Sequence, residues 1–154
     1  MGKKEETIRN ISGNILKTLF RHQKSSRTRI SKSLKITPAT ITNMISYLVA
    51  EKKVMETGDE VRDYMGSGRS RRLITVNSQY RHYIGIEINA NGIYLAVTDT
   101  IGNLITNSNI EIAEYDSQQM NDIFIRLVTE TLDKVSYLEF GALGIAVPGL
   151  LDSR

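Results

Sequence analysis

The chain has 154 residues, of which 40% are hydrophobic and 24% charged, and it contains no cysteine. This composition is enough for one domain or two small ones with packed cores, and it excludes disulfides and thiolate metal sites. No apolar run reaches the ~18 residues of a membrane span and the N-terminus lacks the apolar core of a signal peptide, so we expect a soluble, cytoplasmic protein.

The charge is divided between the two halves of the chain. Residues 1–82 carry 17 Lys and Arg against 7 Asp and Glu, a net charge of +10, whereas residues 83–154 carry 3 against 10, a net charge of −7. A basic front half suggests a module that faces a polyanion. The two histidines, His22 and His82, lie far apart among basic residues, which predicts surface side chains and no metal site.

The first 51 residues contain three helical patterns. Apolar residues at three- and four-residue spacing predict a first helix that ends near His22, with a buried side made of Ile8, Ile11, Ile15, Leu16, Leu19 and Phe20. A second helix follows the Ser25-Ser26 cap signal and buries Ile30 and Leu34. In the third, Thr37 is the expected N-cap and Pro38 the first helical residue, and the helix runs to about Glu51 with Ile41, Ile45 and Leu48 buried.

Two short helices joined by a tight turn predict a helix-turn-helix. The outer face of the third helix is polar and carries no carboxylate before Glu51, as a helix that enters the major groove requires. Asn43 can bond an adenine edge, and the threonine methyls can meet thymine methyls. The predicted base-reading residues are Thr37, Pro38, Ala39, Thr40, Thr42, Asn43, Ser46 and Tyr47. The alternative is a purely structural three-helix unit.

A strand at Val54–Thr57 and a returning strand at Leu73–Val76 predict a hairpin, the wing of a winged helix-turn-helix over residues 1–79. Its tip contains Gly66 and Gly68 among arginines. Two interpretations stay open: arginines in a narrow minor groove, or a basic loop that touches only phosphates. The predicted DNA contacts to the backbone or minor groove are Lys35, Lys52, Lys53, Arg69, Arg71 and Arg72.

Residues 80–154 read as three strands, a helix and a strand. The strands are expected at Tyr83–Ile88, Tyr94–Asp99 and Leu104–Ile112, and the helix from Asp116 or Ser117 to about Ser136. The final segment, Gly141–Pro148, is apolar and glycine-spaced like a buried parallel strand. The fold class expected for the whole chain is therefore α+β.

A winged helix-turn-helix followed by YIGIEINANGIYLAVTDTIGNLI and GALGIAVPGLLD resembles the ROK family, which includes sugar-responsive repressors and sugar kinases. The resemblance implies a second domain of the actin-like, hexokinase-type (ribonuclease H-like) α/β fold. In the kinases a phosphate loop of pattern Asp-x-Gly-Gly-Thr stands where this chain has Glu87-Ile88-Asn89-Ala90-Asn91, without the glycines and the threonine. We therefore expect no enzyme activity, no catalytic residue and no cofactor.

The resemblance also implies a remnant of the family's sugar cleft. Its predicted residues are Glu87 and Asn89 together with Pro148, Gly149 and Asp152, which match a Gly-Ile-x-x-Pro-Gly-x-x-Asp pattern. The family's catalytic aspartate, zinc motif and second lobe come after the position of Arg154. The second domain is thus expected to be incomplete, and the alternative is a complete small protein with a minimal ligand domain.

These expectations together predict a DNA-binding transcriptional repressor of carbohydrate genes, acting as a homodimer on a palindromic operator in double-stranded DNA. In the family, the second domain supplies dimerisation and binds a sugar or sugar-phosphate effector. Two alternatives stay open: a fragment of a sugar kinase with an appended DNA-binding head, and an adaptor that binds nucleic acid without sequence preference.

Overall fold

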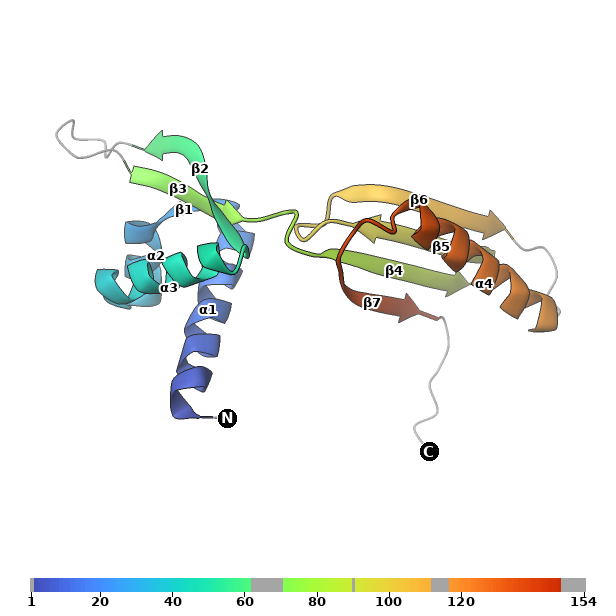
Figure 1. Cartoon of the computed structure of the whole chain (residues 1–154), viewed down its shortest axis with the longest axis horizontal. Helices are drawn as coiled ribbons and strands as arrows, with labels where there is room; N and C mark the ends of the chain where they lie inside the picture. Colours follow the sequence, from blue (N-terminus) through green and yellow to red (C-terminus); the bar gives the residue numbers. More distant parts are fainter. Residues whose placement is uncertain (1, 62–70, 90, 112–116, 148–154) are drawn as a thin grey trace. The chain divides into compact units, whose positions relative to one another are not determined.

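A computed structural model of the chain describes residues 2–61, 71–89, 91–111 and 117–147 (Figure 1). The chain divides into two compact units, Met1–Asn77 and Ser78–Arg154, each with its own hydrophobic core. Within the described ranges, every helix is too short or too polar to cross a lipid bilayer. The structure is of the mixed α+β class.

The first unit contains three helices, α1 at Lys3–His22, α2 at Arg27–Leu34 and α3 at Pro38–Ala50, as the sequence predicts. Phe20 is the exception to the predicted packing, because half of its surface is exposed. It lies near the end of α1, where the spacing of apolar residues alone does not show which side the neighbouring elements cover. The core residues of this unit are Ile15, Leu19, Ile30, Ile41, Met44, Ile45, Leu48, Val54, Ile74 and Val76.

Side-chain caps fix the ends of α2 and α3. The hydroxyl of Ser26 accepts a hydrogen bond from the amide of Arg29 at 3.3 Å, which satisfies one of the free amides at the start of α2. The turn between the helices places Lys35 in the left-handed region, with φ 54° and ψ 37°. Ser31 stabilises this turn, because its hydroxyl donates to the carbonyl of Ile36 at 2.6 Å while its carbonyl accepts from the Ile36 amide.

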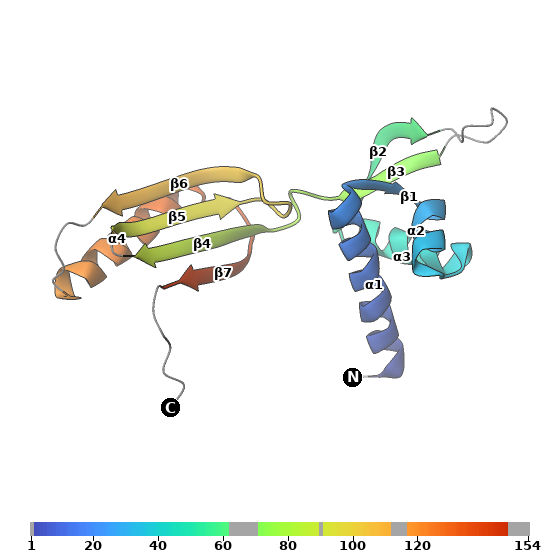
Figure 2. The same ribbon diagram turned by 180° about the vertical axis from the view of Figure 1, so that it is seen from behind.

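A small antiparallel sheet packs against these helices (Figure 2). Its strands are β1 at Lys24–Ser26, β2 at Val54–Val61 and β3 at Arg71–Val76, in the order β1-β3-β2. The predicted hairpin is confirmed, with Val54 paired to Val76, and its strands extend beyond the predicted bounds. Strand β1 was not predicted, because three residues are too few to show an alternating pattern.

The second unit contains the predicted order of three strands, a helix and a strand. They are β4 at His82–Asn89, β5 at Gly92–Thr98, β6 at Leu104–Glu111, α4 at Ser117–Lys134 and β7 at Phe140–Ala146. The sheet has the order β6-β5-β4-β7, with β4, β5 and β6 antiparallel and β7 parallel to β4. Helix α4 packs on the face that carries Ile84, Ile86, Ile93, Leu95 and Val97.

Two predictions about burial in this unit are wrong. Strand β7 is parallel, as predicted, but it is exposed: Leu143 and Ile145 have about half of their surface accessible (50% and 53%). They share a face with the core residues Ile84 and Ile86, but β7 is an edge strand and α4 packs on β5 and β6. His82, predicted at the surface, is 4% exposed, because its place at the start of β4 puts its side chain on the core face.

Candidate nucleic-acid interface

The outward face of α3 is polar and open. Thr42, Asn43, Ser46 and Tyr47 are exposed, whereas Ile41, Met44, Ile45 and Leu48 on the opposite side form the core. The segment 37–50 contains no Asp, Glu, Lys or Arg. Apart from Tyr47 and Val49, the exposed side chains of this segment are short hydrogen-bonding groups and methyls, and none is a carboxylate that would repel a phosphate backbone.

The N-terminal end of α3 carries the other predicted base-reading residues. Thr37, Pro38 and Ala39 are exposed, and Thr40 is half-buried. The hydroxyl of Thr37 accepts from the Thr40 amide at 3.3 Å and lies 2.9 Å from the Thr40 hydroxyl. The Thr37 hydroxyl thus serves as the helix cap.

Tyr47 lies toward the other end of α3, at a distance from this first turn. With Leu48 and Lys53 it lines a hollow of about 480 Å³, whose opposite wall is α1 through Ile8, Ser12 and Leu16. Its contact with DNA stays a prediction.

Three lysines flank the polar face. Lys35 precedes α3 and Lys52 follows it; both are exposed and both have a left-handed backbone, with φ 54° and 58°. Lys53 is partly buried, and its ammonium lies 3.6 Å from the carboxylate of Glu51. Each end of α3 therefore has an exposed cation next to it, and a lysine is a side chain that can contact a phosphate.

At the base of the hairpin, the carboxylate of Glu56 on β2 joins two arginines. Arg27 at the start of α2 lies 2.5 Å from one carboxylate oxygen, and Arg72 on β3 lies 3.3 Å from the other. The hydrogen bond from Arg27 and then that from Arg72 hold the pKa of Glu56 below its ordinary value, against the opposing effect of burial, so the group is ionised at neutral pH. Sequence reasoning missed Arg27 and Glu56, which are 29 residues apart.

The other predicted arginines are described only in part. Arg71 is the first residue of β3, of which the structure describes the main chain, and Arg69 lies outside the described residues. Their contacts with DNA stay predictions.

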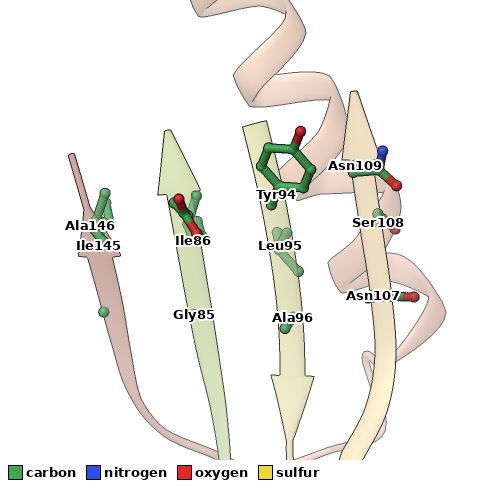
Figure 3. Close-up of a pocket in the computed structure, with 12 residues that line it drawn as sticks. Gly85, Ile86, Tyr94, Leu95, Ala96, Asn107, Ser108, Asn109, Ile145 and Ala146 are labelled. Atoms are coloured by element: carbon green, nitrogen blue, oxygen red, sulfur yellow. The ribbon is translucent and has the colours of Figure 1, made fainter. Parts of the chain in front are cut away.

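In the second unit, a hollow of about 700 Å³ lies on the face of the sheet opposite α4 (Figure 3). Its floor is made of Gly85, Ala96 and Gly144, which are neighbours across three strands. Tyr94 and Asn109 stand at one end, beside Glu87. The structure therefore offers an aromatic ring, amides and a carboxylate around a floor of small residues.

Only part of the predicted cleft remnant can be placed. Glu87 lines this hollow, and the side-chain amide of Asn89 donates to its carboxylate at 2.9 Å. Pro148, Gly149 and Asp152 lie outside the described residues. Among the side chains that are described, no group of three or more His, Asp or Glu could hold a metal ion.

The chain is similar to known repressors over most of its length. It is 32% identical to a putative xylose repressor of Caldicellulosiruptor sp. (strain Rt8B.4) over 91% of this chain, and 30% identical to a xylose repressor of Caldicellulosiruptor bescii over the same share. The chain spans about a third of the length of these curated relatives, 35% in each. No family model matches the sequence.

The fold is also shared with a solved structure. A crystal structure of a ROK family transcriptional regulator, described as a homolog of the Escherichia coli Mlc protein, superposes with a TM-score of 0.65 at 20% sequence identity. The match covers 92% of this chain and 36% of that one.

Proposed function

We propose a function from the premise that this chain belongs to the ROK family of transcriptional regulators, which its xylose-repressor relatives and the shared fold support. The chain binds double-stranded DNA through its first unit and acts in a sugar-responsive transcriptional repressor. The observation that carries this proposal is the exposed, carboxylate-free face of α3 with cations at both ends.

The first unit is, in this proposal, a winged helix-turn-helix. Helices α2 and α3 are joined by the short turn at Lys35, and the β2–β3 hairpin is the wing. Helix α3 enters the major groove with its N-terminal end leading, as recognition helices of this motif do.

The division of contacts follows from chemistry and position. Asn43 reads an adenine edge, and Thr40 and Thr42 present methyl groups to thymine. Thr37, Pro38 and Ala39 lie at the leading end of the helix, with Ser46 and Tyr47 toward the groove margin. Phosphates are contacted by Lys35, Lys52 and Lys53, and these contacts position the head without reading sequence. The wing arginines Arg69, Arg71 and Arg72 contact the adjacent minor groove or the phosphates beside it.

The second unit is proposed to be the first part of a hexokinase-type domain that binds a sugar or sugar-phosphate effector in the longer relatives. Its order of three antiparallel strands, a helix and a strand parallel to the first is compatible with that fold. A single head reads few base pairs, so a homodimer on a palindromic operator is needed for specificity. The dimer then has two arrangements, of which one binds the operator better. The effector lowers operator affinity by no more than the ratio of its own affinities for these two arrangements.

The proposal is tested by selecting binding sites from a random duplex library with the purified chain at low ionic strength. We expect enrichment of a short sequence, with affinity for it well above that for scrambled duplex. Retention of duplex without enrichment of any sequence would leave only the adaptor interpretation, and no retention at all would refute the proposal. A kinase assay with a panel of hexoses is expected to show no turnover, because both glycines and the threonine of the phosphate loop are absent.

A further inference from the structure

Three charged side chains from separate elements meet at the base of the wing. Glu56 lies on β2, Arg72 on the neighbouring strand β3, and Arg27 at the first position of α2. Each oxygen of the carboxylate is engaged by a different guanidinium. One carboxylate thus neutralises one of two cations beside the predicted DNA-binding helices.

The two ion pairs differ in distance and exposure. The Arg27 pair is 2.5 Å long and its side chains are 30% and 31% exposed, whereas the Arg72 pair is 3.3 Å long and the arginine side chain is 69% exposed. An exposed ion pair contributes little free energy and is screened by salt, so Arg72 can leave Glu56 at low cost. Arg27 is the partner that stays.

A DNA phosphate is a suitable acceptor for the guanidinium that leaves. Arginine forms paired hydrogen bonds to phosphate with the same planar geometry that it uses for carboxylate. The Glu56 carboxylate and a DNA phosphate are therefore alternative acceptors for the same guanidinium, that of Arg72.

We propose that Arg72 is an exchangeable arm that binds Glu56 in the free protein and a backbone phosphate when the chain binds duplex DNA. Glu56 keeps its ion pair with Arg27 in both the free and the DNA-bound protein. This inference rests on the proposed function, since it requires that the first unit bind DNA. Because phosphates carry no sequence information, the exchange changes affinity for all duplexes alike, and Glu56 limits non-specific binding.

The inference is tested with Glu56→Gln, Arg72→Gln and the double variant, each titrated on the selected duplex and a scrambled one at several salt concentrations. Arg72→Gln removes one phosphate contact, so the slope of log K against log salt is expected to become less steep by about 0.9 on both duplexes. Glu56→Gln removes the competitor, and a gain of roughly two- to fivefold on both duplexes is expected from the strength of exposed ion pairs.

The double variant separates the arm from a general effect of charge. The control is Glu130→Gln, which makes the same change of charge at an exposed residue of α4 in the second unit. In the Arg72→Gln background, Glu56→Gln is expected to raise the affinity for duplex DNA by no more than this control does. Thermal melts confirm that each variant is folded.

The same gain in both backgrounds, or no gain from Glu56→Gln while the wild-type chain binds duplex, would overturn the exchange. Failure of the wild-type chain to bind any duplex at low salt would instead refute the proposed function, so the two failures are distinguishable.

Discussion

Replacing Thr37 by Ala tests the capping of helix α3 by the residue that precedes it. The hydroxyl of Thr37 is the only side-chain acceptor that the structure shows for the first-turn amides of α3 within the described residues, at 3.3 Å from the Thr40 amide. Loss of such a cap costs about 1 kcal/mol. The contact between the two hydroxyls is exposed and water replaces it, so it adds little. We expect the free energy of unfolding to fall by about 1 kcal/mol.

The assay is urea unfolding followed by circular dichroism, without DNA. Thr37→Ser keeps the oxygen and is expected to retain most of the stability. Thr42→Ala makes the same chemical change at an exposed interior position of α3, where alanine is the better helix former, and is expected to be neutral or slightly stabilising. Equal midpoints for Thr37→Ala and Thr42→Ala would refute the capping argument.

Three further perturbations test the core of the first unit, a close backbone contact in the second sheet and the carboxylate that follows β5. Ile45→Ala, at a fully buried position, should lower the free energy of unfolding by about 2–5 kcal/mol, and the transition that shifts in denaturant unfolding is that of the first unit. Gly92→Ala should cost about 1–3 kcal/mol, because a Cβ would lie 2.1 Å from the carbonyl oxygen of Ile110; Gly85→Ala, with open space, is the control and should be tolerated in denaturant unfolding. Asp99→Asn should flatten the dependence of the melting temperature on pH at acid pH; a wild-type slope retained in the variant would contradict this.

The sign of that last effect follows from the surroundings of the carboxylate. Burial alone would raise the pKa of Asp99, but hydrogen bonds from the backbone and side chain of Asn103 and from the amides of Ile101 and Gly102 outweigh it, so the pKa lies below its ordinary value. A folded-state pKa below the unfolded one contributes stability above the unfolded pKa of about 3.9. That stability is lost as the pH falls through the folded-state pKa.

Local signals predicted the elements of the first unit well. Thr37 and Pro38 together set the start of α3, and Ser26 sets that of α2, because capping depends on residues within a single turn. The pairing of β1 with β3 could not be predicted, since it joins Ser25 to Ile74 across α2, α3 and β2. The same holds for the contact between Arg27 and Glu56, which depends on tertiary packing.

The errors in the second unit have a common physical origin. The apolar pattern of Leu143 and Ile145 predicts a strand correctly, but the pattern does not say which neighbour covers it. Exposure depends on where α4 packs across the sheet, which is a property of the assembled fold. The burial of His82 likewise follows from the register of β4 and not from the basic residues near it in sequence.

The central claim is that the outward face of α3 reads base pairs, and Asn43→Ala tests it most directly. Its affinity for the selected duplex and for a scrambled duplex is measured at one salt concentration beside the wild-type chain. A lost amide contact to an adenine edge predicts a loss of about 1–3 kcal/mol on the selected duplex and almost none on the scrambled one. An equal loss on both duplexes, or no loss on either, would contradict base reading by this face.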